Sequence, residues 1–84
     1  APSGPGTIEV DFVVRRGAEY IAIEAKTKPM LHAHDLKGLR AIQTLPGLTR
    51  RVVVFLGERP FRTDDGIEAL PVRHFLNELE QGTV

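Results

Sequence analysis

The chain contains no cysteine, which excludes disulfides and thiolate metal sites. It also has no apolar run near the roughly 18–20 residues that a bilayer-spanning helix needs, and no signal-peptide pattern at its start. Neither charge is in excess, because 11 Lys and Arg balance 11 Asp and Glu. Non-specific phosphate binders are usually basic, so any nucleic-acid contact has to come from a local patch. We therefore expect a cytoplasmic protein with no membrane contact.

With 84 residues, the chain has room for one domain and one hydrophobic core. Its composition, 42% hydrophobic and 26% charged, is that of a folded globular protein rather than a disordered one. Residues 1–6 are rich in Pro and Gly and no initiator Met precedes them, so we expect a flexible linker or the cut edge of a longer polypeptide. We place an α/β domain at residues 7–80 and a short tail at residues 81–84.

Alternating side chains predict a β-hairpin near the N-terminus. Apolar and polar residues alternate from Thr7 to Arg15, and residues 19–26 form a second strand-like segment. Arg16-Gly17 stands between them, and Gly17 can supply the positive φ that a tight hairpin turn requires. The two strands are expected to be antiparallel neighbours.

The rest of the chain predicts a helix, two strands and a final helix. Leucine and isoleucine at helical spacing favour a helix over residues 35–45, ended by Pro46-Gly47. Residues 51–57 are almost continuously apolar, as in a strand buried on both faces, and residues 67–70 form a short strand. Pro71 suits the first turn of a last helix. The order β-β-α-β-β-α indicates an α/β fold, a mixed sheet with helices packed on it. The apolar stripe expected on the last helix consists of Val72, Phe75, Leu76 and Leu79.

Three charged residues interrupt the apolar hairpin strands: Asp11, Glu24 and Lys26. A charge in a core strand costs several kcal/mol unless it is paired or bound to a metal. If Arg16-Gly17 forms a two-residue loop, Asp11 pairs with Ala22 and becomes a diagonal neighbour of Glu24, at about 7–8 Å between Cβ atoms. The three side chains are then expected on one face of the sheet.

Two carboxylates on one face can share a divalent cation such as Mg²⁺ or Mn²⁺, which binds hard oxygen ligands. The cation can polarise a phosphoryl oxygen and activate water, while Lys26 orients that water or stabilises developing negative charge. The pattern therefore favours metal-dependent phosphodiester hydrolysis. Two alternatives stay open: a structural cluster of ion pairs, and a site that keeps its form while the domain only binds.

Asp11 followed by Glu24-Ala25-Lys26 on the next strand resembles the D…(D/E)-x-K signature of the PD-(D/E)XK nuclease superfamily. The resemblance implies that Asp11 and Glu24 bind the metal, that the Ala25 carbonyl is a backbone ligand and that Lys26 is the catalytic lysine. It also implies a restriction-endonuclease-like core that here lacks its opening helix, so that Glu9 partly substitutes for the acid of that helix.

More specifically, the chain is similar to the nuclease-like C-terminal domains of bacterial and archaeal AAA+-type ATPases of unknown function. The similarity runs from about Thr7 to Leu79. It implies DNA and a parent ATPase domain in the same polypeptide as partners, with Lys37 and Arg40 as a weak nucleic-acid contact. The alternative function is a non-catalytic interaction or oligomerisation module of a larger ATPase, and an exposed edge strand would favour a homo-oligomer.

Overall fold

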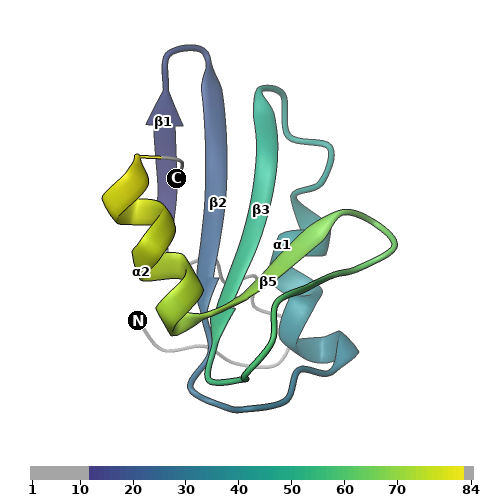
Figure 1. The fold of residues 1–84 in the computed structure, drawn as a ribbon. Helices are drawn as coiled ribbons and strands as arrows, with labels where there is room; N and C mark the ends of the chain where they lie inside the picture. The colour runs from purple at the N-terminus through teal and green to yellow at the C-terminus, as the bar shows by residue number, and fades with distance from the viewer. Residues whose placement is uncertain (1–11, 83–84) are drawn as a thin grey trace.

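The computed structural model describes residues 12–82, and these contain one mixed sheet with helices packed on it (Figure 1). The α/β fold class predicted from the sequence is confirmed. Along the chain the strands are β1 (Phe12–Arg16), β2 (Glu19–Ala25), β3 (Leu48–Phe55), β4 (Phe61–Arg62) and β5 (Ile67–Pro71). The helices are the 3₁₀ turn η1 (Ala33–Leu36), α1 (Lys37–Ala41) and α2 (Val72–Gln81).

The strands lie in the order β1-β2-β3-β5-β4 within the sheet. β2, β3 and β5 are mutually parallel, whereas β1 and β4 run antiparallel to their neighbours β2 and β5. The carboxyl ends of the three parallel strands therefore meet at one edge of the sheet. The mixed character expected from the element order follows from this arrangement, because the segment with η1 and α1 returns the chain to start β3 parallel to β2.

The hairpin register differs from the predicted one by two residues. Arg16 pairs with Glu19 and Val13 with Ala22, so the loop is Gly17-Ala18 rather than Arg16-Gly17. Gly17 has a φ of 62°, as expected, and occupies the first loop position, where type II′ hairpin turns place glycine. Because the shift is an even number of residues, Val13 keeps the face that it shares with Ala22. The predicted pairing of Asp11 lies outside the described residues.

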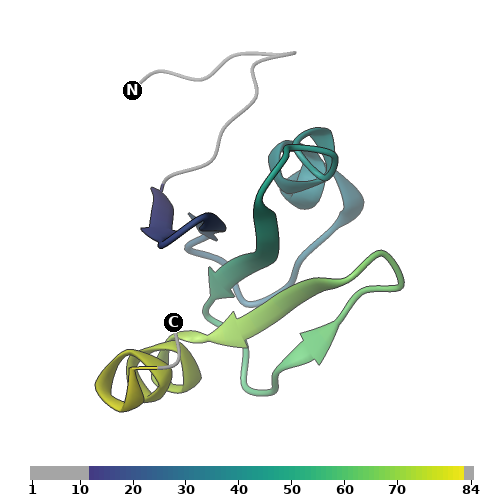
Figure 2. The ribbon, with the colours of Figure 1, turned by 90° about the horizontal axis from the view of Figure 1, so that it is seen from above.

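Two apolar layers cover opposite faces of the sheet (Figure 2). Leu36 and Leu39, from η1 and α1, pack with Val53 and other residues on one face, the α1 face. Phe75 of α2 packs on the other, the α2 face, against a cluster that consists of Ile21, Ile23, Val52, Val54 and Leu70. β3 contributes to both clusters, so the expectation that its apolar run is buried on both faces is confirmed.

The helix predicted over residues 35–45 is shorter and less regular than expected. It begins as a 3₁₀ turn at Ala33, and α1 ends at Ala41. The Leu45 amide then bonds back three residues to the Ile42 carbonyl, and the Leu45 side chain is 46% exposed. Tyr20 donates its amide to the Gly47 carbonyl at 2.7 Å and pairs with Leu48, so β3 starts three residues earlier than predicted. Residues 42–45 therefore lie in turns between α1 and β3 and do not continue the helix.

Two further differences concern the C-terminal half. The polar stretch before β5 contains the short strand β4, whose Phe61 pairs with Ala69 and meets the Phe55 ring edge-on at 5.8 Å. The last helix forms as predicted, but it begins at Val72, so Pro71 is its N-cap and the last residue of β5 rather than part of its first turn. Its apolar stripe, however, is only partly covered, since Phe75 packs on the core whereas Leu76 is 54% exposed.

Among residues 12–82 the longest helix is α2, whose ten residues fall far short of what a bilayer crossing takes.

Candidate metal site and a neighbouring pocket

Glu24 lies inside the sheet near the carboxyl end of β2. It pairs with Val53 of β3 and is only 3% exposed, on the α1 face. Lys26 directly follows β2, and its backbone amide donates a hydrogen bond to the Val54 carbonyl of β3 at 2.8 Å. Its Nζ lies 3.6 Å from Glu24 Oε1, and its side chain is 25% exposed. The structure therefore brings two of the three predicted catalytic side chains together.

The other predicted metal ligands are placed less completely. Asp11 and Glu9 lie outside the described residues. Ala25 pairs with Val54 in the β2–β3 ladder. Within residues 12–82, no group of three or more His, Cys, Asp and Glu side chains is arranged to hold a metal ion. The Glu24 carboxylate and the Ala25 carbonyl are hard oxygen donors of the kind that Mg²⁺ and Mn²⁺ bind, so they fit such an ion, provided that Asp11 supplies a second carboxylate.

A second buried carboxylate, Asp35, lies in the segment that follows Lys26. It is 3% exposed, and its oxygens accept hydrogen bonds from Lys28 Nζ and from the His32 amide, both at 2.8 Å. Burial by itself raises the pKa of Asp35, but the hydrogen bonds from Lys28 and His32 and the nearby His34 outweigh it and lower the pKa below its usual value. The sequence suggested Asp35 only as a helix start.

The bond between Lys28 and Asp35 fixes the turn beyond the candidate metal site. The Lys28 carbonyl also accepts a hydrogen bond from the Leu56 amide at 3.0 Å, which connects this turn to the end of β3. His32 and His34 stack their rings with centroids 6.0 Å apart. The segment after Lys26 is therefore anchored by charge, backbone bonds and ring packing.

The two residues predicted to contact nucleic acid differ in their surroundings. Lys37 is exposed at the start of α1. Arg40 donates from Nε to Asp65 Oδ2 at 3.1 Å, and Arg51 lies 3.6 Å from the same oxygen. The hydrogen bond from the Thr63 hydroxyl lowers the pKa of Asp65. Burial acts in the opposite direction, and the hydrogen bond from Arg40 lowers the pKa further. Much of the charge of Arg40 is thus neutralised locally, and Lys37 is the more available of the two.

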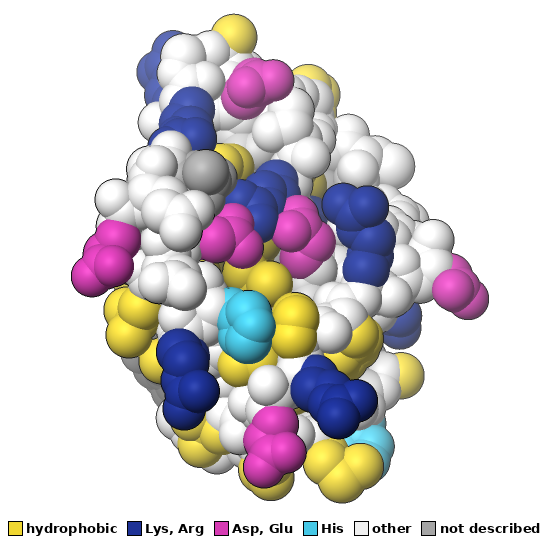
Figure 3. Space-filling view, in the orientation of Figure 1, with side chains coloured by type: hydrophobic (Ala, Val, Ile, Leu, Met, Phe, Trp, Pro, Cys, Tyr) yellow, Lys and Arg dark blue, Asp and Glu magenta, His cyan; other side chains and the backbone are white. Residues whose placement is uncertain are grey.

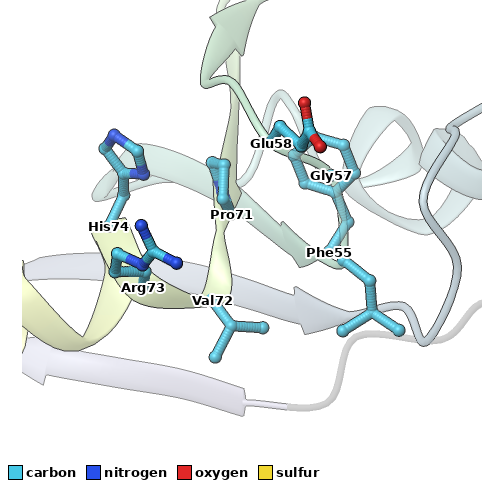
Figure 4. A pocket seen from close by; sticks show the side chains of 8 residues that line it. Phe55, Gly57, Glu58, Pro71, Val72, Arg73 and His74 are labelled. Atoms are coloured by element: carbon cyan, nitrogen blue, oxygen red, sulfur yellow. The ribbon is translucent and has the colours of Figure 1, made fainter.

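Sequence reasoning did not find a surface pocket of about 490 Å³ at the carboxyl ends of β3 and β5 (Figure 4). Figure 4 shows Arg73 and His74 on the α2 side of it and Phe55 and Glu58 on the other. Ligands of open α/β sheets commonly bind outside the carboxyl ends of strands, which is where this pocket lies. The signal in the sequence was Gly57 directly after the buried strand. The lining consists of Phe55, Leu56, Gly57, Glu58, Pro71, Val72, Arg73 and His74.

Gly57 is required by the packing of this pocket. A Cβ atom at this position would lie 2.1 Å from the Phe55 ring, so only glycine leaves the ring in place. The ring is in turn fixed by its edge-on contact with Phe61. One wall of the pocket is therefore set by three residues from β3, β4 and the loop between them.

The fold and the site define a small α/β domain whose mixed sheet buries an acidic side chain beside a lysine. Over residues 3–75 the sequence matches the family described as Domain of unknown function (DUF4143), and the chain belongs to that family. No curated protein and no solved structure matches the chain.

Proposed function

We propose that this domain is nuclease-like and holds or hydrolyses DNA phosphodiesters through Asp11, Glu24 and Lys26, with Mg²⁺ or Mn²⁺. The observation that carries the proposal is the burial of Glu24, 3% exposed, with Lys26 Nζ 3.6 Å from its Oε1. A carboxylate in a core strand costs several kcal/mol, and proteins keep such a cost chiefly where function needs the charge.

Each residue has a distinct part in the proposal. The carboxylates of Asp11 and Glu24 and the carbonyl of Ala25 would hold the ion, with Glu9 as a further acid. When bound, the ion supplies Lewis acidity and lowers the pKa of a coordinated water. Lys26 keeps its ammonium beside Glu24, where it can orient a water molecule or stabilise negative charge on a phosphate oxygen.

The surroundings support a phosphate-bearing substrate. Glu24 and Lys26 stand near the carboxyl end of β2, at the same edge of the sheet as the pocket beyond β3 and β5. Lys37 at the start of α1 is exposed and could contact the nucleic-acid backbone. A parent ATPase domain in the same polypeptide is part of this proposal, as the resemblance of residues 7–79 to the nuclease-like domains of such ATPases implies.

The test is a titration of the purified protein with MnCl₂, followed by thermal unfolding. A resident ion stabilises the folded state by about 2.7 kcal/mol at one hundred times its Kd. Glu24→Gln and Asp11→Asn should abolish this stabilisation, while Glu80→Gln, on the exposed side of α2, should keep it. Nicking of supercoiled plasmid in Mg²⁺, lost in Lys26→Met, would show hydrolysis. An equal Mn²⁺ response in wild type and Glu24→Gln, or none in either, contradicts the metal site.

A second candidate is a non-catalytic interaction or oligomerisation module of a larger ATPase. Two observations favour it. Within residues 12–82, Glu24 is the only acid of the predicted metal site, and Lys26 already lies beside it. In addition, α2 exposes apolar side chains. This candidate predicts no response to Mn²⁺ and an association that depends on protein concentration. The same titration, combined with sedimentation, separates the two functions.

A further inference from the structure

One side of α2 exposes an apolar stripe, which consists of Val72, Leu76 and Leu79 at 39%, 54% and 48% exposure. Their spacing of four and three residues aligns them along the helix. Glu78 lies on another side of α2, the helix that covers the α2 face of the sheet, and accepts a hydrogen bond from Arg50 of β3. Phe12 of β1, 57% exposed, pairs with Ile23 and therefore belongs to the same face of the sheet. Figure 3 shows exposed apolar side chains on this face among charged ones.

Two charges border this stripe in an unusual arrangement. Arg73 lies three residues before Leu76 and Glu80 four residues after it, so both flank Leu76 on the same side of the helix. The cation is in the first turn and the anion in the last, which is opposite to the preference of the helix dipole. Within residues 12–82, neither side chain makes an ion pair or a side-chain hydrogen bond, and both are exposed. At the C-terminal end of α2 the Arg16 guanidinium donates to the Gly82 carbonyl at 2.7 Å and offsets part of this placement, whereas Arg73 in the first turn has no acidic side chain against it within residues 12–82.

We propose that α2 is a self-association surface, on which a second copy of this chain docks with its own α2 antiparallel about a twofold axis. Leu76 lies near the axis, and Arg73 of each copy faces Glu80 of the other. Arg73 and Glu80 are about 10 Å apart along the helix, and reversing the direction of one helix exchanges their positions. The twofold thus creates two identical ion pairs around an apolar centre, as an isologous interface requires.

The charge pattern is the reason for choosing a second copy as the occupant. A stripe with a cation near one end and an anion near the other is complementary to itself when reversed. The contact is small compared with stable interfaces of about 1,200–2,000 Å², so the dimer should form and dissociate at micromolar concentrations. This inference goes with the interaction function above and does not depend on the metal site.

The experiment is sedimentation velocity from low to high micromolar protein. Wild type should shift from monomer to dimer, whereas Arg73→Glu and Glu80→Arg should each weaken association at least tenfold, because each places like charges opposite each other. An equimolar mixture of the two variants should dimerise again, since one copy then carries two acids and the other two bases. Leu76→Gln should also give a monomer.

Both charge reversals agree with the helix dipole, so neither variant should have a lower Tm than wild type in dilute solution, and loss of dimer is then separable from misfolding. Matched controls are Leu45→Gln, which alters a 46% exposed leucine outside α2, and Arg59→Glu, which reverses an exposed cation elsewhere; both should dimerise as wild type does. A monomeric wild type, unchanged association in the two charge variants, or a mixture that stays monomeric would overturn the proposal. The Mn²⁺ response is read separately, so either proposal can fail alone.

Discussion

Arg50 joins three elements of the domain, and its replacement by methionine is the sharpest test of how α2 is held to the sheet. From β3, Arg50 donates to both carboxylate oxygens of Glu68 on β5, at 2.7 and 2.8 Å, and to Glu78 on α2 at 2.7 Å. The three side chains are 20%, 21% and 27% exposed. The bonds to Glu68 first, and then to Glu78, outweigh burial and raise the pKa of Arg50, which stays charged at every working pH.

The expected loss on Arg50→Met lies between two limits. Fully exposed pairs contribute about 0–1 kcal/mol, and breaking a fully buried pair costs about 3–5 kcal/mol. Because these side chains are largely buried and the change leaves two carboxylates facing each other, we expect a loss of about 2 kcal/mol in the free energy of unfolding. For a domain of this size that corresponds to a fall in Tm of about 8–16 °C.

The measurement is urea unfolding followed by far-ultraviolet circular dichroism at low protein concentration, with the thermal melt as a second readout. Glu78→Gln, which removes the charge of the partner on α2 and leaves Glu68 in place, should cost about 1 kcal/mol. Arg59→Met is the matched control, since Arg59 is exposed and should be replaceable with almost no change. If Arg50→Met unfolds within about 0.5 kcal/mol of wild type, the ion-pair network does not hold α2 to the sheet, and the role assigned to Arg50 is wrong.

Three further variants test local features of the structure. The lowered pKa of Asp35 means that its carboxylate stabilises the fold above the unfolded value of about 3.9 and that this contribution is lost as the pH falls through the folded value. Asp35→Asn should therefore cost about 2 kcal/mol in the free energy of unfolding at pH 7, because it weakens the bond with Lys28. It should also make urea unfolding less dependent on pH between pH 7 and pH 3. An unchanged pH dependence would argue against the role of the buried carboxylate. Gly57→Ala should cost about 1–3 kcal/mol in the same assay, because its methyl group displaces the Phe55 ring, and wild-type stability would show that the ring moves freely. Gly17→Ala should cost about 1 kcal/mol through the positive φ of this position, with no steric term because nothing lies within 4 Å; a neutral result would place the turn in another conformation.

The elements that were predicted best are those whose pattern is local. Val52 to Phe55 form an unbroken apolar run, and a run of that kind has to be buried on both sides wherever its strand lies. Gly17 marked the hairpin because few other residues adopt a positive φ. The acid and lysine of the candidate site were found for a similar reason: a charge within an apolar strand stands out without any knowledge of the fold.

The elements that were missed depend on partners distant in the sequence. Arg16-Gly17 and Gly17-Ala18 are both two-residue loops and put the same residues on the same face, so local pattern did not separate the two registers. The predicted helix through residue 45 is shorter in the structure, where Tyr20, far earlier in the chain, bonds to Gly47 and pairs with Leu48, so residues 42–47 form the turns that lead into β3. β4 forms because Phe61 meets Phe55 and Ala69.

By itself, the sequence determined the class of the fold, the strand that is buried on both faces and the two charges of the candidate site, since these follow from periodicity and from the cost of burying charge. The tertiary structure alone decided the hairpin register, the partners of Arg50 and Asp35, the pocket beyond β3 and the exposure of one side of α2. Each of these depends on how distant segments align across the sheet. That alignment is set by the sum of many weak long-range contacts, which no short stretch of sequence contains.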